Sequence, residues 1–256
     1  LADVVVAATA YESPLDDHDL PLQAVATAAA SYLRDLRPAP HRLGVSWGRT
    51  MHALASRMED GWAAGVEVVQ LNGGVSRSST PTHADAIAAR LAETGGGAAH
   101  LLAAPAIVER AEIRRALESD RAVAESLELA RGADVAIFSL GALSADSVLA
   151  QSGYLAREEI DDLTARGCAG DLLSRFIGPG GGICDEGLDA RTIGLPLEAL
   201  AEKRRSIGVA VGVGKAAIAR AAVAGGYVNA LVVDEELAQQ LLEPAAPAAG
   251  PLARAH

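Results

Sequence analysis

The sequence predicts an α/β domain with a doubly wound, mainly parallel sheet, and three observations carry this prediction. Short apolar runs rich in Val, Ile and Leu recur along the 256 residues, and most of them are unbroken rather than alternating. Unbroken runs are typical of strands buried on both faces of a parallel sheet. Between the runs lie Ala-rich segments with helical periodicity, and this alternation of strand and helix favours right-handed βαβ units.

Each element follows from a local pattern. We expect strands at 4–8, 43–45, 66–71, 135–140, 207–211 and 228–233, where the apolar runs fall. We expect helices at 22–36, 83–93, 107–130 and 215–224, where apolar residues recur at helical spacing. The glycine-rich stretch 177–190 predicts a surface hairpin or loop. We therefore predict one domain over 1–243, followed by a Pro/Ala-rich tail over 244–256 that does not pack.

The composition excludes several classes of function. The formal net charge is −11 and no run of Lys and Arg occurs, so the chain by itself repels nucleic acid. No apolar run reaches the roughly 18 residues that a membrane-spanning helix needs. The apolar N-terminus, LADVVVAATA, has no basic residues ahead of it and therefore predicts a strand rather than a signal peptide.

The two cysteines point to a reducing environment. Cys168 and Cys184 form no CxxC pair and have no nearby His at metal-ligand spacing. We therefore expect two ordinary thiols, no disulfide framework and a cytoplasmic location. We also expect no metal and no cofactor.

The stretch LGVSWGRTMHALASRM (43–58) predicts an anion-binding loop. A strand end is followed by a turn of small residues and then by a helix, and amide groups at a helix start bind phosphate well. Gly48 allows close approach of the backbone, while Ser46 and Thr50 offer hydroxyls and Arg49 offers charge. The alternative is an ordinary strand–turn–helix in which Thr50 caps the helix.

Two further strand ends carry candidate pocket residues. Asn72, Gly73 and Gly74 follow the strand at 66–71 within QLNGGVSRSSTPTHAD, and Gly141 follows the strand at 135–140 in FSLGAL. The carboxyl ends of parallel strands share one edge of the sheet, so these loops are expected to face one crevice. The alternative for the Asn-Gly-Gly stretch is a polar loop without a ligand.

Lys215 stands in a glycine-rich turn that resembles two nucleotide motifs. The P-loop motif is excluded, because Val209 replaces its first glycine and Ala216 replaces the Ser or Thr that binds magnesium. GVGKAA fits a dinucleotide fingerprint, with Asp234 at a suitable distance beyond Gly212, although little chain follows to complete such a site. The simpler interpretation is that Lys215 meets an anion or a hydroxyl.

The remaining polar candidates give little sign of catalysis. Asp171, in GCAGDLLSRF, either accepts hydrogen bonds from sugar hydroxyls or caps a helix. The histidines are scattered, and no G-x-S-x-G nucleophile motif occurs. The acidic run REEIDDL predicts a solvated helix start rather than an acid/base pair.

Taken in order, these pieces resemble one family. The chain resembles the effector-binding domain of SorC/DeoR-type bacterial sugar-responsive transcriptional regulators in the order of its motifs. These motifs are GVSWGRT, LNGG, ADVAIFSLGAL, GCAGDLLSRF, RTIGLPLEAL and GKAAIARAAVAGGYVNALVVDEELA. The resemblance covers almost the whole chain, from about residue 1 to residue 242. It implies a Rossmann-like, three-layer domain of the kind shared with sugar-phosphate isomerases and CoA-transferases.

The resemblance also implies a partner and an assembly. The ligand is expected to be a phosphorylated sugar, and the protein is expected to form a homodimer or homotetramer without enzymatic activity. Operator DNA is expected to bind only through a helix-turn-helix domain, which in the family precedes this one and is absent from these residues. No contact with a membrane is implied.

The resemblance assigns roles to individual residues. Gly48, Arg49 and Thr50 match the loop that holds the ligand phosphate, and the Asn-Gly-Gly stretch matches the second pocket loop. Asp171 matches an acid that contacts sugar hydroxyls, and Lys215 matches a lysine that reaches the ligand. The full expected set is Ser46, Trp47, Gly48, Arg49, Thr50, Asn72, Gly73, Gly74, Gly141, Asp171 and Lys215.

Two positions depart from the family pattern. Val211 stands ahead of the lysine where a glycine is usual, and Arg49 stands where smaller residues are common, which favours a more anionic ligand. Two alternatives to a sensor stay open at this point. One is a sugar-phosphate isomerase or deaminase that uses Lys215 and Asp171 as base and acid, and the other is a dinucleotide-binding module.

Overall fold

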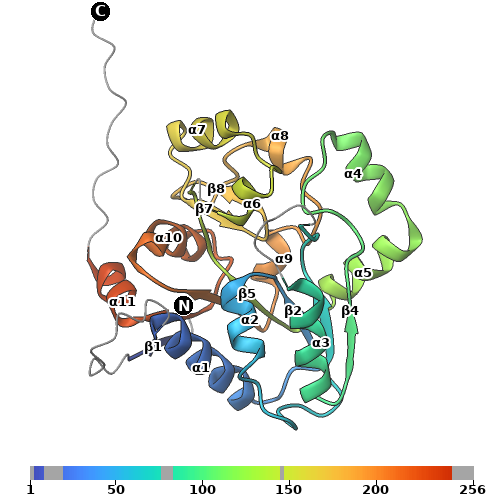
Figure 1. Cartoon of the computed structure of the whole chain (residues 1–256), viewed down its shortest axis with the longest axis vertical. Coiled ribbons are helices and arrows are strands. Elements are labelled where there is room, and N and C mark those ends of the chain that lie inside the picture. The colour runs from blue at the N-terminus through green and yellow to red at the C-terminus, as the bar shows by residue number, and fades with distance from the viewer. Residues whose placement is uncertain (1–2, 9–19, 76–82, 145–146, 244–256) are drawn as a thin grey trace, which may run out of the picture.

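The main sheet confirms the predicted doubly wound topology. The computed structural model describes residues 3–8, 20–75, 83–144 and 147–243, and within them seven strands form one sheet in the order β1-β10-β9-β5-β2-β3-β4 (Figure 1). Every pairing in this sheet is parallel. The strands are β1 (Asp3–Ala7), β2 (Arg42–Val45), β3 (Glu67–Gln70), β4 (Ala98–His100), β5 (Val135–Ser139), β9 (Arg205–Ala210) and β10 (Ala230–Asp234).

The unbroken apolar runs have a direct structural cause. Each central strand sends alternate side chains into two separate cores, one on each face of the sheet. In β5, Val135 and Ile137 belong to one core, whereas Ala136 and Phe138 belong to the other. Both faces of the strand are therefore apolar, as the sequence predicted for most of the strands that it identified, whereas β1, at the edge of the sheet, leaves Val4 and Val6 exposed.

Helices cover both faces of the sheet. The first core is closed by α1 (Leu20–Asp35), α2 (Arg49–Ala55) and α3 (Ala84–Thr94). The second core is closed by α5 (Arg121–Arg131), α9 (Glu198–Ala201), α10 (Ala216–Ala224) and α11 (Glu235–Leu242), with a 3₁₀ turn, η1 (Val213–Lys215), ahead of α10. The chain thus forms the three layers expected of a Rossmann-like domain.

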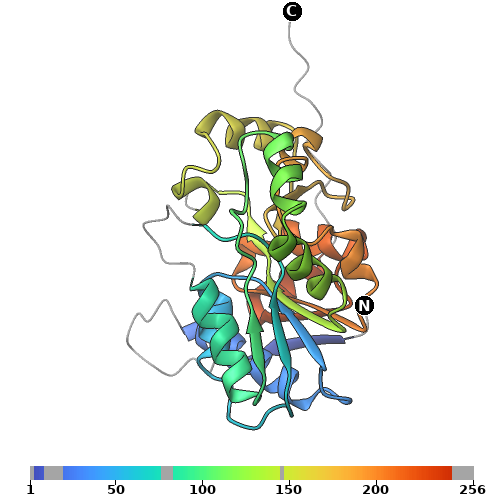
Figure 2. The same cartoon turned by 90° about the vertical axis from the view of Figure 1, so that its right-hand side faces the viewer.

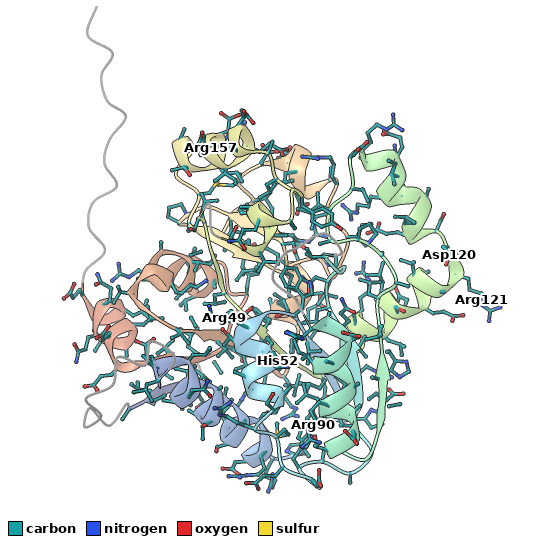
Figure 3. The ribbon with its side chains drawn as sticks, viewed as in Figure 1. Arg49, His52, Arg90, Asp120, Arg121 and Arg157 are labelled. Carbon is teal, nitrogen blue, oxygen red and sulfur yellow. A yellow bond between two sulfur atoms is a disulfide. The ribbon has the colours of Figure 1, made fainter. Side chains whose placement is uncertain are left out.

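The predicted helical segment 107–130 is wrong as a single element. It contains two helices, α4 (Ala111–Glu118) and α5, which meet at the bend labelled by Asp120 and Arg121 in Figure 3. Asp120 caps α5, because its carboxylate accepts hydrogen bonds from the amides of Ala122 (3.0 Å) and Val123 (3.5 Å). An acidic N-cap starts a new helix, and this signal outweighed the continuous apolar spacing.

A small lobe stands beyond the carboxyl ends of the main strands (Figures 1 and 2). It contains an antiparallel sheet of β6 (Gly141–Ala142), β7 (Gly170–Leu172) and β8 (Arg175–Ile177). Three helices accompany it, α6 (Val148–Gln151), α7 (Arg157–Ala165) and α8 (Glu186–Asp189). The acidic run REEIDDL forms α7, as predicted, whereas strands of two or three residues carry no periodicity and were missed.

The expectation of two free thiols is wrong. Cys168 and Cys184 form a disulfide, with their Cα atoms 5.9 Å apart. The two residues flank the β7–β8 hairpin, which turns the chain back on itself and brings its two ends together. The spacing of 16 residues in the sequence gave no sign of this, because the strands of the hairpin were not predicted.

Two regions of the prediction lie outside the described residues. These are the tail over 244–256 and the central part of the loop after Asn72-Gly73-Gly74, residues 76–82. Among the residues that the structure describes, no helix is both long enough and apolar enough to cross a membrane.

Candidate ligand-binding site

A cavity of about 400 Å³ lies between the carboxyl ends of the main strands and the small lobe. This is the position at which open parallel α/β sheets bind ligands, and the volume is in the range of small-molecule sites. Its wall is formed by Leu22, Ser46, Trp47, Gly48, Arg49, Thr50, Asn72, Ser139, Leu140, Gly141, Ala142, Ser144, Ser147, Val148, Leu149, Asp171, Leu173, Ser174, Val211 and Lys215.

The structure brings together all but two of the residues expected at the site. Gly73 and Gly74 are not part of the cavity wall. The carbonyl of Gly73 accepts a hydrogen bond from Trp47 Nε1 at 2.8 Å, and the amide of Gly74 donates to Ala104 O at 2.8 Å. These glycines therefore support the wall from behind. A Cβ atom at Gly73 would lie 2.3 Å from the carbonyl oxygen of Pro105, so only glycine fits there.

One wall is the loop at the start of α2. Gly48 has φ 120° and occupies the N-cap position, so the N-cap residue itself has no side chain with which to cap the helix. The alternative in which Thr50 caps α2 is therefore not what the structure shows. Ser46 joins two strand ends, since its Oγ accepts a hydrogen bond from the amide of Ser139 at 3.2 Å. Figure 3 shows Arg49 at the end of α2 that faces the small lobe.

The opposite wall carries Asp171. It lies in β7, which excludes the helix-capping alternative, and it pairs with Gly141 of β6. A Cβ atom at Gly141 would lie 1.7 Å from Asp171 Oδ1, so the missing side chain makes room for the carboxylate. The amide of Ser174 donates to Asp171 Oδ2 at 3.1 Å.

Asp171 and Lys215 form a pair of opposite charges in a poorly solvated place. Burial raises the pKa of Asp171, and the charge of Lys215 and the hydrogen bond from Ser174 oppose this rise. Burial likewise lowers the pKa of Lys215, and the charge of Asp171 opposes that change. Each charge is thus costly in these surroundings, and perturbed groups of this kind cluster at functional sites.

Two other charged residues, Lys203 and the Asp234 of the dinucleotide alternative, have structural roles. Lys203 is buried, and its ammonium donates to the carbonyls of Ala130 (3.1 Å) and Arg131 at the end of α5. Asp234 caps α11 through the amide of Leu237 at 2.9 Å, and its other oxygen accepts from the amide of Gly212. Asp234 is 4% exposed and each of its oxygens accepts a backbone amide, so this carboxylate serves the local fold and does not support the dinucleotide alternative.

Sequence reasoning missed most of the lobe side of the cavity. Three serines, Ser139, Ser144 and Ser147, lie in the wall, and their recurrence in SLGALSADS was an available signal. Leu173 and Ser174, at the turn between β7 and β8, had none, because Leu-Ser is not a typical hairpin turn.

The fold and the site define a small-molecule-binding α/β domain, and comparison with known proteins gives its family. Residues 1–243 match the family Sugar-bind, which is described as "Putative sugar-binding domain". The chain belongs to this family, and its resemblance to SorC/DeoR-type regulators is confirmed.

Relatives and solved structures agree with this assignment. The deoxyribonucleoside regulator of Bacillus subtilis is 33% identical over 230 residues, which cover 90% of this chain and 73% of that protein. The full-length sorbitol operon regulator SorC from Klebsiella pneumoniae has a TM-score of 0.82 at 27% identity, covering 94% of this chain and 76% of that chain. A DeoR family transcriptional regulator from Listeria monocytogenes has a TM-score of 0.80 at 25% identity, covering 93% of each chain.

Proposed function

We propose that this domain senses a phosphorylated sugar for a bacterial transcriptional regulator. The observation that carries the proposal is that one cavity is lined both by the start of α2, whose N-cap is Gly48, and by the opposite charges of Asp171 and Lys215. The amides of Gly48 to Thr50, the Thr50 hydroxyl and Arg49 hold the phosphate. Asp171 and Lys215 orient the hydroxyl groups.

Control of DNA binding is the second part of the proposal. The relatives are named as regulators of deoxyribonucleoside, erythritol and sorbitol genes. We infer that DNA is bound by a helix-turn-helix domain outside residues 1–243, since the net charge of −11 makes this chain a poor partner for DNA. Ligand binding then shifts the packing of a homodimer or homotetramer and changes the spacing of its DNA-binding heads.

A thermal-shift screen tests the ligand class. The panel contains ribose 5-phosphate, 2-deoxyribose 5-phosphate, glucose 6-phosphate, mannose 6-phosphate, fructose 1,6-bisphosphate and sorbitol 6-phosphate, each beside its unphosphorylated parent. A ligand at a hundred times its Kd stabilises the native state by about 2.7 kcal/mol, which is easily measured. We expect at least one phosphorylated compound to raise Tm more than its parent and more than inorganic phosphate do.

The same screen separates a sensor from an enzyme. If no compound raises Tm, the proposed function is contradicted. Turnover of any panel member by the purified domain supports the isomerase alternative instead. A sensor returns every compound unchanged.

Replacing Asp171 by Asn is expected to weaken the ligand without weakening the fold. A hydrogen bond to a charged group contributes about 1.5–3 kcal/mol, so affinity for the best panel compound should fall by about tenfold or more. The unfolding free energy should stay equal or rise, because the variant removes a buried charge whose pKa burial raises. Calorimetric titration and urea unfolding measure the two effects. Asp120→Asn, at the exposed cap of α5, is the matched control and should change neither.

The two pKa shifts give the unliganded protein an unusual pH dependence. A raised pKa means that native Asp171 binds more protons than the unfolded chain, so its contribution to stability falls as pH rises above the ordinary value of 3.8. The lowered pKa of Lys215 makes its contribution rise with pH as the ordinary value of 10.5 is approached. The unfolding free energies of the wild type and Asp171→Asn can be measured in urea across this pH range. The value for the wild type should fall relative to that of the variant as Asp171 ionises. If the unfolding free energy of the wild type instead increases relative to that of the variant over this pH interval, the burial of the Asp171 charge is contradicted.

The same two shifts set the pH range for binding. Affinity should decline at acid pH when Asp171 is protonated, and at alkaline pH when Lys215 loses its charge. Each decline should begin closer to neutrality than an exposed carboxylate or amine would allow. Titrations of the best panel compound across pH measure both limits.

Gly141→Ala is expected to displace Asp171 from the cavity. The new methyl group would collide with the carboxylate, so either the side chain turns away or β6 separates from β7. Affinity for the best panel compound should fall by about tenfold or more, as for loss of the charged hydrogen bond. Gly180→Ala, with no neighbouring atom within 4 Å of the added Cβ, is the control and should bind normally. Unchanged affinity in Gly141→Ala would exclude Asp171 from ligand contact.

A further inference from the structure

The turn between β7 and β8 has a strained backbone in a buried place. Leu173 and Ser174 have φ values of 52° and 70°, in the left-handed region that side chains disfavour. Hairpin turns of this hand usually carry Asn or Gly. The two residues are only 3% and 1% exposed, and both line the cavity. Strain of this kind persists where the surroundings impose it, and it concentrates at functional sites.

Ser174 contacts two polar groups of the cavity at once. Its amide donates to Asp171 Oδ2 at 3.1 Å, and its Oγ accepts from Asn72 Nδ2 at 3.3 Å. Asp171 belongs to the small lobe, whereas Asn72 follows β3 of the main sheet. One residue therefore fixes the position of two cavity groups that come from different parts of the fold.

Asn72 keeps one polar atom without a partner. Its side chain is 2% exposed, yet Oδ1 has no hydrogen-bond partner among the described residues. An unsatisfied buried acceptor is costly and calls for an explanation. In this structure Ser174 Oγ accepts from Nδ2, which leaves Oδ1 unpaired, and because Asn72 is part of the cavity wall a ligand hydroxyl that approaches it would satisfy this acceptor.

We infer that Ser174 is a positioning residue that sets the stereochemical preference of the site. It holds Asp171 and Asn72 as two acceptors at a fixed relative position, which match two hydroxyl groups of one ligand. A sugar whose hydroxyls have the matching configuration reaches both acceptors, and its epimer reaches only one. This inference rests on the proposed function for the sugar, and it does not depend on the phosphate.

Epimer pairs test the inference. Calorimetric titrations use ribose 5-phosphate with arabinose 5-phosphate, and glucose 6-phosphate with mannose 6-phosphate, on the wild type, Ser174→Ala, Asn72→Ala and the double variant. We expect Ser174→Ala to weaken the preferred epimer by about tenfold and to bring the ratio of the two Kd values towards one. The double variant should bind as Asn72→Ala does, because Ser174 acts through Asn72. An unchanged ratio, or losses that multiply in the double variant, would overturn the inference.

Two further variants separate positioning from stability. Ser174→Gly adopts positive φ freely and lacks the hydroxyl, so it should fold well and show the same loss as Ser174→Ala. Ser206→Ala removes an equally buried hydroxyl, which donates to Tyr227 O at 2.6 Å and is not part of the cavity wall. It should leave both the affinities and the epimer ratio unchanged, and a change in that ratio would count against Ser174.

A measurement without ligand tests the role of Ser174 even if the proposed function is wrong. If none of the sugar phosphates binds the wild type, the ligand class is wrong, and the role of Ser174 is tested through the side-chain amide hydrogens of Asn72 by NMR. Slow hydrogen exchange in the wild type and Ser206→Ala, with fast exchange in both Ser174 variants, supports the inference. Equal rates in all four proteins overturn it.

Discussion

Arg175→Met is expected to remove about 3–5 kcal/mol of unfolding free energy, as the loss of one partner from a buried ion pair typically does. The Arg175 side chain is 3% exposed. Its guanidinium donates to the Asp189 carboxylate and to the carbonyls of Asp189, Leu195, Thr192 and Gly194. Met fills a similar volume but donates to none of these acceptors, so each loses its hydrogen bond from Arg175, whereas the Asp189 carbonyl keeps other donors, Arg114 Nη1 and the Thr192 amide.

The measurement is urea unfolding at constant pH, followed by circular dichroism and by fluorescence. Arg166→Met is the matched control, because Arg166 also pairs with an aspartate, Asp185, at 3.1 Å, but its side chain is 52% exposed. A surface pair contributes at most about 1 kcal/mol, so the control should lose little. Equal losses in the two variants would show that burial of the Arg175 network is not what stabilises the 189–195 segment.

Reduction of the Cys168–Cys184 disulfide is expected to lower the unfolding free energy by about 3 kcal/mol. The bond closes a segment of 16 residues, and a crosslink of that length removes about this much chain entropy from the unfolded state. Unfolding in the presence and absence of a phosphine reductant measures the difference. The intact mass confirms the oxidation state.

The double variant Cys168→Ser/Cys184→Ser separates the crosslink from other effects of the reductant. It should match the reduced wild type in stability and should not respond to reductant. If the mass shows an intact disulfide before treatment and the unfolding curve of the wild type is the same with and without reductant, the expected contribution of the disulfide to stability is contradicted.

The main sheet could be predicted because its sequence signal is local. A strand that feeds two cores is apolar at every position, and such runs are visible without knowledge of the neighbours. β4 and the strands of the small lobe were missed for the opposite reason. They span two or three residues, and pairing partners far along the chain hold them in place. The break between α4 and α5 depended on one capping aspartate within a continuous periodic pattern.

The residues of the candidate site likewise fall into those that a local sequence pattern predicts and those that depend on distant contacts. The loop at 46–50 and Lys215 follow predicted strands, so parallel topology alone placed them at one edge of the sheet. Ser174 carried no signal, because its left-handed conformation is accompanied by contacts with Asn72 and Asp171 and does not follow from its own preference. The disulfide was not predicted because the β7–β8 hairpin, which brings the two cysteines together, was not predicted either.

The origin of the residues in the cavity wall determines which substitutions would alter the ligand preference of this fold. Its sheet side is assembled from positions scattered between Leu22 and Lys215, whereas its lobe side comes from two short stretches, 141–149 and 171–174. Substitutions at the polar positions of these two stretches would reshape the recognition surface, whereas Leu149, Leu172 and Leu173 also pack into the two cores and would have to stay. An exchange of ligand preference between relatives would therefore change the polar wall residues of 141–149 and 171–174 and keep the leucines that serve the cores.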